Sequence, residues 1–523
     1  MFSEISAAMY KYIQPKFRSK SARLARRPVP TLEELRNTRI EKLKKLQHAG
    51  LLAYPAKTNR THRISDVLKN FKKLSGGILG KKNIVIAGRI MAKRGQGGLS
   101  FLDINDGSGK MQAVIKTDKI GEKGYQFFLD VFDIADFIEV KGTLFTTKRG
   151  EKSLEVQDYK MLSKALLPLP EKWHGLCDIE ECLRKRYLDI IFHPDVKEMI
   201  RKRTIFWASM REFLVEKEFL EVETPVLETT PGGADARPFK THHNALDLDV
   251  YLRISMGELW QKKLMVAGFE KTFEIGRQFR NEGMDAEHLQ DYTQMEFYWA
   301  YADYEKGMEF VEEMYKYVAQ KTFGTLKFKI HGFEVDLGGK WEKYDYQSII
   351  AKYTGINIEE ASLAEIEKTL QKLKIDYDKK GFNITRGIDN LWKYCRKNIG
   401  GPGFLINVPI VMEPLAKRMP ASPAGGEKNN KVQRFQVILA GSEIGKGYSE
   451  LNDPIDQAER FAEQQKLRDK GDDEAQRFDK DFVEALEHGM PPTCGFGVSE
   501  RLFSFLMDKP ARECQIFPLM RPR

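Results

Sequence analysis

Two runs of alternating apolar and polar residues lie between residues 273 and 304. Their apolar positions are Phe273, Ile275, Phe279, Met295, Phe297 and Trp299. Among the positions between them are Glu274, Gln278, Arg280, Glu282, Gln294, Glu296 and Tyr298. A period of two predicts strands, and the Gly- and Asp-containing loop between the runs predicts an antiparallel hairpin. Because the aromatic residues indicate covered, central strands, the charged face is expected to be paired or to bind a ligand.

The same kind of pattern divides the rest of the chain. Residues 31–54 space their apolar side chains as an amphipathic helix does. Between residues 83 and 165, five short runs are separated by turns that contain Gly, Asp or Lys, which is typical of a small closed barrel of the OB type. We therefore expect a basic tail at 1–30, a helical segment at 31–82, the barrel at 83–165, a linker at 166–190 and a main domain at 191–523 with a variable insertion around 325–400.

Residues 191–523 mix helical and strand patterns, so an α+β fold is predicted. A helix over about 195–217 leads into the strand FLEVETPVL, which is expected to end at Pro225. A mobile loop is expected at 420–431, and a charged helix at 455–488. The segment GFGVSERL is interpreted as a glycine-containing turn that enters an apolar helix.

Composition indicates a class of partner and a compartment. The 85 Lys and Arg exceed the 75 Asp and Glu and give a net charge of +10, which favours a polyanion such as nucleic acid. Residues 1–30 carry seven basic residues and one acid, and are expected to be a disordered tail; an RNA-contacting arm and an organelle transit segment are the alternatives. Five cysteines without a CxxC spacing disfavour zinc and disulfides, and fit the cytoplasm. No apolar run approaches the roughly 18 residues that cross a bilayer, so no membrane is expected.

Candidate chemistry gathers around the predicted hairpin. Arg280 and Arg501 are suited to phosphates, and Glu443 to a divalent cation held against the same phosphates. Arg501 begins an apolar helix, where the helix dipole disfavours a cation, so an anion is expected there. The surplus acceptors suit a small cationic substrate: Glu258, Glu296, Tyr298 and Glu450. Neither a Walker A sequence nor a dinucleotide-binding GxGxxG sequence occurs.

On the predicted barrel, Arg89, Phe101 and Gln112 suit single-stranded nucleic acid. An arginine neutralises a phosphate, an aromatic ring stacks on a base, and an amide reads base edges. The alternative places Phe101 in the barrel core.

Several segments together resemble one family. They are FLEVETP, FRNEG through QMEFYWAYADY, GFGVSERL, PGGADARPF, GYSELNDP and FPLMRP. The chain resembles the class II lysyl-tRNA synthetases, whose motifs 1, 2 and 3 correspond to the first three of these segments. The sequence KMLSK at 160–164 resembles the KMSKS loop of class I enzymes, but no HIGH sequence precedes it, and we interpret it as a coincidence.

The resemblance implies an OB barrel that binds the anticodon, a catalytic domain on a six- or seven-stranded antiparallel sheet, and a homodimer. It implies ATP, L-lysine and tRNA(Lys) as substrates, with Mg²⁺ as cofactor. The residues it places around ATP are Arg280, Glu282, His288, Tyr292, Glu443 and Arg501, of which Arg280 and Arg501 are expected to be catalytic. Those around lysine are Gly232, Glu258, Arg280, Glu296, Tyr298, Lys446, Tyr448 and Glu450. At the anticodon it places Phe101 and Gln112, near Arg89.

Three positions depart from the family. Gln436 stands where members usually have a carboxylate, so its place in a metal site with Glu443 is in doubt. Lys446 stands where lysyl enzymes usually have asparagine, and GFGVSER is one residue short before Arg501. An aspartyl- or asparaginyl-type synthetase is one alternative, although it would need a basic pocket. A synthetase-like, non-catalytic RNA-binding or regulatory protein is another. A lysyl ligase that acts on proteins is disfavoured, because such paralogues lack the barrel.

Overall fold

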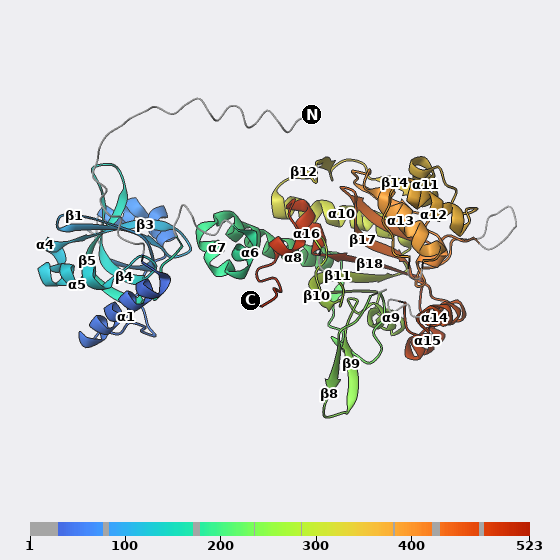
Figure 1. The fold of residues 1–523 in the computed structure, drawn as a ribbon, viewed down its shortest axis with the longest axis horizontal. Helices are drawn as coiled ribbons and strands as arrows, with labels where there is room; N and C mark the ends of the chain where they lie inside the picture. The colour runs from blue at the N-terminus through green and yellow to red at the C-terminus, as the bar shows by residue number, and fades with distance from the viewer. Residues whose placement is uncertain are drawn as a thin grey trace. The chain divides into compact units, whose positions relative to one another are not determined.

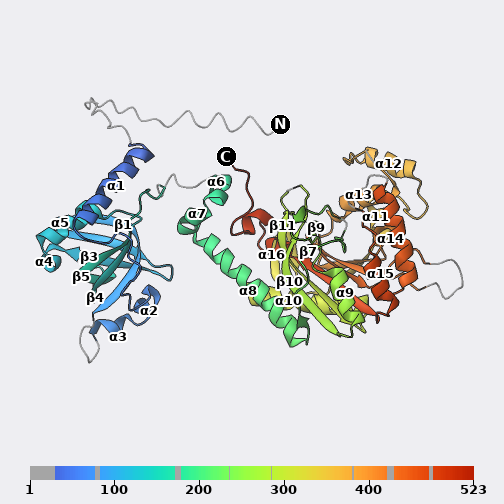
Figure 2. The same ribbon diagram turned by 90° about the horizontal axis from the view of Figure 1, so that it is seen from below.

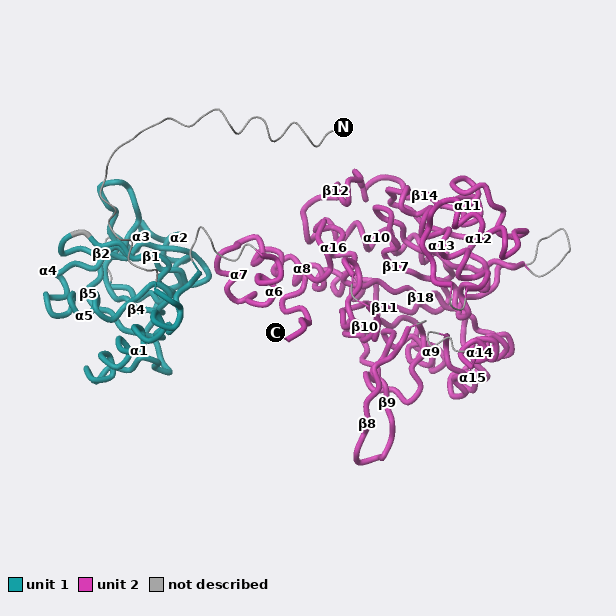
Figure 3. The backbone as a smooth tube through the Cα atoms, viewed as in Figure 1, with its two compact units in different colours: residues 1–175 teal, residues 176–523 magenta. Residues whose placement is uncertain are grey.

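The computed structural model describes residues 30–522 apart from 77–82, 171–177, 235, 284, 380–381, 421–428 and 470–474. The chain forms two compact units, residues 1–175 and 176–523, coloured separately in Figure 3. The division falls inside the predicted linker. The predicted basic tail, except for residue 30, and most of the loop predicted at 420–431 lie outside the described residues.

The described part of unit 1 starts with three helices and continues as a barrel. The helices are α1 (Leu32–His48), α2 (Ile64–Lys69) and α3 (Phe71–Gly76). The barrel strands are β1 (Ile84–Gln96), β2 (Leu99–Asn105), β3 (Lys110–Lys116), β4 (Phe137–Thr146) and β5 (Lys152–Ser163). They close in the order β1-β2-β3-β5-β4, which confirms the predicted barrel. Two helices that the sequence analysis did not predict, α4 (Thr117–Ile120) and α5 (Glu122–Val131), separate β3 from β4.

Unit 2 contains the remaining elements (Figure 1). Its helices are α6 (Ile179–Arg184), α7 (Arg186–Phe192), α8 (Pro194–Glu216), α9 (Glu258–Val266), α10 (Tyr304–Phe323), α11 (Tyr346–Thr354), α12 (Leu363–Lys372), α13 (Ile384–Arg396), α14 (Pro454–Asp469), α15 (Lys480–Glu487) and α16 (Arg501–Leu506). Its strands are β6 (Leu220–Glu221), β7 (Leu227–Glu228), β8 (Lys240–His243), β9 (Leu248–Leu252), β10 (Lys271–Phe279), β11 (Asp291–Ala300), β12 (Lys327–Ile330), β13 (Phe333–Asp336), β14 (Glu342–Asp345), β15 (Gly403–Ile406), β16 (Arg434–Leu439), β17 (Ser442–Ser449) and β18 (Thr493–Ser499). Among these described residues no helix is long and apolar enough to span a bilayer.

Eight of these strands form the main sheet, in the order β14-β15-β16-β17-β18-β11-β10-β6. The six from β15 to β10 pair antiparallel, as predicted. The sheet is larger than expected because β14 and β6 add at its two edges, each parallel to its neighbour. β14 comes from the predicted insertion at 325–400, so part of that segment belongs to the main sheet.

The predicted hairpin is confirmed as β10 and β11, with Phe273 opposite Phe297 and Glu274 opposite Glu296. The two phenylalanines belong to an apolar core that also includes residues of α8, α10 and α16. Figure 2 shows α8 and α10 beside the β10–β11 end of the sheet. Tyr298 belongs to a second apolar core with Leu259 of α9. The alternation therefore separates an apolar face, under α8 and α10, from a face that carries the polar residues.

Three predicted elements differ in the structure. The helix expected at 455–488 is two helices, α14 and α15, and the Asp479 side chain caps the second by accepting from the Phe482 N–H. The expected linker already contains α6 and most of α7. The glycine-containing turn before Arg501 is strand β18, because Gly495 and Gly497 leave space for neighbouring side chains rather than bend the chain.

Candidate active site

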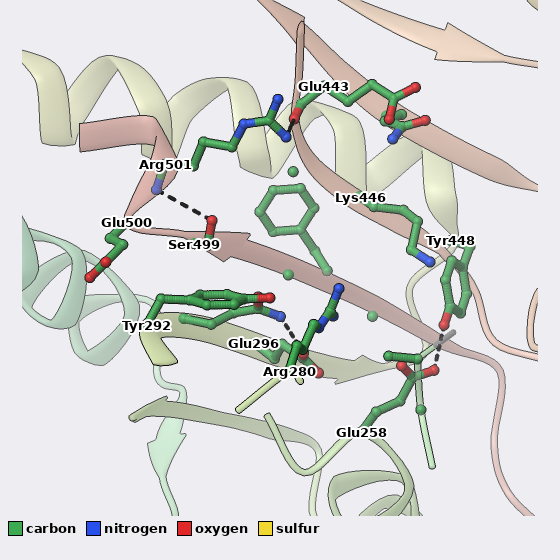
Figure 4. Close-up of a pocket in the computed structure, with 18 of the residues that line it drawn as sticks. Glu258, Arg280, Tyr292, Glu296, Glu443, Lys446, Tyr448, Ser499, Glu500 and Arg501 are labelled. Carbon is green, nitrogen blue, oxygen red and sulfur yellow. Dashed lines mark hydrogen bonds between the residues drawn. The ribbon is translucent and has the colours of Figure 1, made fainter. Parts of the chain in front are cut away.

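A cavity of about 350 Å³ lies in unit 2 against β11 and β16–β18 (Figure 4). Segments that are far apart in the sequence line it, including α9, the loop between β10 and β11, and the start of α16. The predicted site residues among the lining are Glu258, Arg280, His288, Tyr292, Glu296, Tyr298, Gln436, Glu443, Lys446, Tyr448, Glu450 and Arg501. The fold thus brings most of the residues predicted for the ATP, lysine and metal sites around one cavity.

One end of the cavity, called the acidic end, consists of Glu258, Glu296 and Glu450 with Tyr298 and Tyr448. Each of the three carboxylate residues is at most 5% exposed. The Tyr448 hydroxyl donates a hydrogen bond to Glu258, and the Tyr298 hydroxyl donates to Glu296 at 3.1 Å. Burial raises the pKa of both tyrosines well above the usual value, so they remain protonated donors. The acidic end is therefore a buried anionic pocket with fixed carboxylates.

Glu296 lies at the centre of the polar contacts on β11. Its Oε1 accepts from the Met256 backbone N–H at 3.0 Å and from the Gln294 amide at 2.6 Å. Burial, and then the charge of Glu258, raise the pKa of Glu296 to about 7. A cation that binds beside Glu296 stabilises its ionised form and lowers that pKa.

A lysine of the chain itself lies behind the acidic end. Lys262 is four residues after Glu258 on α9, and its Nζ is 2.8 Å from Glu258 Oε1 and 2.5 Å from Glu450 Oε2. Burial alone would lower the pKa of Lys262, but the charges of Glu258 and Glu450 outweigh it and raise the pKa. Burial also raises the pKa of Glu450, and the nearby Lys262 ammonium opposes that change. We conclude that Lys262 is a charged member of the pocket.

Arg280 stands between Tyr292 and Glu258 in Figure 4, where the cavity passes from the acidic end to the opposite end. Its Nε donates to the Ile254 carbonyl at 3.2 Å, and its guanidinium carbon lies 5.9 Å from the centre of the Tyr292 ring. The Gln278 amide donates to the Tyr292 hydroxyl. This arrangement offers a flat ring and an adjacent cation, which suit an aromatic base and an anionic group.

The opposite end, called the arginine end, consists of Arg501, Glu287 and Glu443. Arg501 donates to the Glu443 backbone carbonyl at 3.1 Å and forms an ion pair with the Glu287 carboxylate. The side chains of Arg501 and Glu287 are 16% and 28% exposed. Burial lowers the pKa of Arg501 to about 10, which leaves it charged at neutral pH. His288 also lines the cavity, with its ring nitrogen 2.8 Å from Asp285.

The two positions that depart from the family pattern face each other. Gln436 on β16 is the register partner of Lys446 on β17. The amide oxygen of Gln436 accepts from Arg434 at 2.8 Å, and Lys446 Nζ lies 3.0 Å from Glu413. Burial would raise the pKa of Glu413, but the charges of Lys446 and Arg434 lower it. The oxygen that Gln436 would offer to a metal already accepts a hydrogen bond from a cation.

Two predicted residues do not line the cavity. Gly232 is replaced there by Gly233 and Ala234, and its carbonyl accepts a hydrogen bond from Ser255 at 2.9 Å. Glu282 is exposed and lies outside the cavity lining, because the chain leaves β10 for a loop before it. The period-two pattern extends past the end of the strand, which is why the sequence placed Glu282 with the others.

The three predicted residues of the barrel differ in their surroundings. Phe101 is partly exposed and is not part of the described barrel core, so the core alternative is wrong. Gln112, on the neighbouring strand, donates to Ser153 at 2.8 Å. Arg89 is turned toward β4, where its guanidinium lies 4.3 Å from the Phe137 ring centre. Phe101 is the most available of the three for stacking.

The fold and the cavity agree with comparisons to known proteins. Residues 178–521 match the family model of tRNA synthetases class II (D, K and N). The chain belongs to the class II tRNA synthetases. Residues 84–162 of this synthetase match the OB-fold nucleic acid binding domain, which covers the barrel.

Two curated relatives of this synthetase are named lysine–tRNA ligase. The chain is 44% identical to the lysine–tRNA ligase of Thermoanaerobacter sp. (strain X514), over 94% of the chain and 97% of that protein. It is 43% identical to the lysine–tRNA ligase of Roseiflexus sp. (strain RS-1), over 94% of the chain and 99% of that protein. The family resemblance seen in the sequence is thereby confirmed.

Several charged residues of this synthetase that lie at the cavity or directly behind it were not identified from the sequence, among them Lys262, Arg434 and Glu287. Lys262 had a detectable signal, since a residue four positions after Glu258 in a helix lies on the same face. Arg434 had one too, because it alternates with Gln436 along a strand. Glu287 had none: its loop has no periodicity, and only the folded chain brings it to Arg501.

Proposed function

We propose that this chain is a lysine–tRNA ligase, which activates L-lysine with ATP and transfers it to the 3′ end of tRNA(Lys) for protein synthesis. The observation that carries the proposal is the acidic end, where three buried carboxylates line one cavity with Arg280 and Arg501. Such a pocket favours a substrate with ammonium groups. The names of the curated relatives support the same substrate.

Within this proposal, Glu296, Tyr298 and Glu450 surround the ε-ammonium of lysine, and Tyr448 lies along its alkyl chain. Glu258, with the backbone near Gly233, takes the α-ammonium. A neutral side chain of the same size would leave buried carboxylates without a partner, and each lost charged hydrogen bond costs roughly 1.5–3 kcal/mol. Ornithine, which is one methylene shorter, is discriminated by only about 1–3 kcal/mol.

The arginine end is proposed to receive ATP. Tyr292 stacks on the adenine with His288 nearby, Arg280 holds the α-phosphate and the lysine carboxylate, and Arg501 holds the far end of the triphosphate. Lys446 is suited to the lysine carboxylate, although its Nζ is paired with Glu413. Glu282 is exposed and is left out of the proposed site.

The residues fit one half of the expected Mg²⁺ site. Glu443 lines the cavity beside Arg501, and its carboxylate oxygens are hard ligands of the kind that Mg²⁺ binds. Gln436 fits less well, because its amide oxygen carries no charge and already accepts a hydrogen bond from the Arg434 cation. A bound Mg²⁺ would neutralise charge on the phosphates.

In the first step the lysine carboxylate attacks the α-phosphorus and releases pyrophosphate, which forms lysyl-adenylate. The carboxylate is already an anion at neutral pH, so the step needs no general base. Arg280 and Arg501 align the reactants and stabilise the charge that develops on the phosphate oxygens. In the second step a ribose hydroxyl at the tRNA 3′ end attacks the lysyl carbonyl carbon, the bond to the adenylate breaks, and AMP leaves.

Other parts of the proposal concern partners and location. The side of the barrel that carries the partly exposed Phe101, with Gln112, is proposed to contact the anticodon. A homodimer is proposed because Leu220, Val226 and Leu227, at the predicted motif 1, expose apolar side chains. None of the four described cysteines is in a disulfide, which suits a cytoplasmic protein.

Exchange of labelled pyrophosphate into ATP, measured with each of the twenty amino acids, tests the proposed reaction. Lysine is expected to drive exchange, and aspartate and asparagine are not. Exchange driven by aspartate would overturn the assignment, and no exchange with any amino acid would favour a non-catalytic protein. Transfer of lysine to tRNA(Lys) by the same preparation tests the second step.

A further inference from the structure

The buried lysine behind the acidic end has no role in the mechanism above. Lys262 is 1% exposed and does not line the cavity. Its Nζ bridges Glu258, 2.8 Å away, and Glu450, 2.5 Å away, and both of these carboxylates do line it. The bridge joins two segments that are almost 190 positions apart in the sequence.

Packing does not require a cation at this position. Leu259 and Met265 on the same helix belong to the apolar core beside the cavity, so a Met at 262 would continue an apolar helix face. Replacing a buried ion pair by apolar residues is often neutral or stabilising, whereas a buried charge costs free energy unless it is paired. We therefore expect the role of Lys262 to lie in its effect on Glu258 and Glu450, the two carboxylates that it contacts.

The charge of the pocket gives the first indication. Glu258, Glu296 and Glu450 would carry three negative charges, and Lys262 cancels one of them. Two remain, and an amino acid with two ammonium groups balances them, while its own carboxylate faces Arg280. Without Lys262, the three crowded carboxylates would hold a further proton at neutral pH, and a protonated carboxyl does not hold an ammonium group.

Orientation gives the second indication. Lys262 contacts Oε1 of Glu258, which also accepts from the Tyr448 hydroxyl. It contacts Oε2 of Glu450, and the other oxygen of Glu450 lies against Gly495 in the cavity lining. One ammonium group thus fixes how both carboxylates are presented to the cavity.

We propose that Lys262 is a positioning residue for the amino acid: its buried ammonium orients Glu258 and Glu450 and sets the pocket to accept two positive charges. This rests on the proposed assignment of the acidic end to lysine. The titratable groups that face Lys262 come from three segments: Glu258 on α9, Tyr448 and Glu450 at the end of β17, and Glu413 before β16.

The test compares Lys262→Met with Lys262→Arg and with Lys263→Met, a matched control on the same helix. Lys263 lies over the Trp260 ring, away from the carboxylates. The Met variant at 262 is expected to lose about tenfold to a hundredfold in lysine affinity at pH 7, with the KM for ATP within about twofold of wild type. The Arg variant recovers part of the loss, and the control loses nothing.

The pH profile separates this role from a merely structural one. The pocket of Lys262→Met holds an extra proton at pH 7 that it loses as the pH rises, so its deficit in lysine affinity is expected to shrink between pH 7 and pH 9. The thermal midpoint should stay at or above that of the wild type. A deficit that does not change with pH, a fall in thermal midpoint with unchanged lysine affinity, or wild-type behaviour overturns the inference. Absence of lysine-driven pyrophosphate exchange in the wild type would refute the proposed function itself. This result distinguishes a failure of the proposed function from a failure of the inference about Lys262.

Discussion

The two ends of the cavity are built differently. At the acidic end the carboxylates of Glu258, Glu296 and Glu450 are buried and held by neighbouring tyrosines, an amide and Lys262. At the arginine end Arg501 and Glu287 are partly exposed, and Glu287 comes from a loop. The acidic end is therefore held by the sheet and α9, whereas the arginine end depends partly on the loop between β10 and β11.

This difference suggests separate tasks for the two ends: selection of the amino acid and binding of the nucleotide. Fixed, buried carboxylates discriminate between amino acids, because a wrong side chain leaves them without a partner. Arg501 is paired with Glu287, and under the proposed function the triphosphate of ATP would replace this carboxylate as the partner of Arg501. Selection of the amino acid and capture of the nucleotide should therefore respond to different substitutions.

The largest effect is expected from Arg501→Ala. Loss of a cation that stabilises the developing phosphate charge costs about 3–4 kcal/mol, which is about a hundredfold to a thousandfold in kcat for pyrophosphate exchange. Lysine affinity, measured by calorimetry without ATP, should change by less than about twofold, because Arg501 is at the other end. A comparable loss of lysine affinity would show that the two ends are not separate.

A pair of substitutions in the two ends is expected to give opposite results. Glu450→Gln should weaken lysine binding about tenfold to a hundredfold, because it removes the charge of a buried partner of the ammonium, and should leave the KM for ATP nearly unchanged. Glu443→Gln, the matched control, should raise the KM for ATP and the Mg²⁺ requirement and spare lysine. Equal losses of both substrates in either variant would contradict the division.

The smallest effect is expected from Glu287→Gln. Its ion pair with Arg501 is partly exposed, so removing it changes the free energy by only about 0.2–1 kcal/mol. Because the triphosphate then displaces no carboxylate, the KM for ATP should fall by about twofold to fivefold. A rise in that KM together with a higher Mg²⁺ requirement would instead make Glu287 a metal ligand.

The sequence predicted the parts of this site that lie on regular strands. The alternation at Phe273, Phe297 and Glu296 determined the hairpin and its polar face, since a period of two leaves no other assignment for covered strands. The OB barrel followed from short strands and turns in the same way. The resemblance to a family then connected Glu258, Glu450 and Arg501, which local patterns cannot relate.

The remaining parts depend on tertiary contacts. Glu287 reaches Arg501 through a loop without periodicity, and the amide oxygen of Gln436 turned out to be held by Arg434. Gly495 and Gly497 were interpreted as turn residues because glycine usually marks turns. Here the glycines are required by neighbours from other strands, which cannot be seen along the chain.

Those two glycines also limit how the enzyme can evolve. A methyl group at Gly495 would collide with Glu450 and come within 2.7 Å of the Tyr298 ring, and one at Gly497 would lie 3.0 Å from Glu296. At these two positions the cavity wall is backbone, with no side chain to exchange. A change of amino-acid substrate would therefore require substitutions among the side chains that line the cavity, such as Glu258, Glu296 and Glu450. Replacing one of these carboxylates would also disturb the charge balance of the other two.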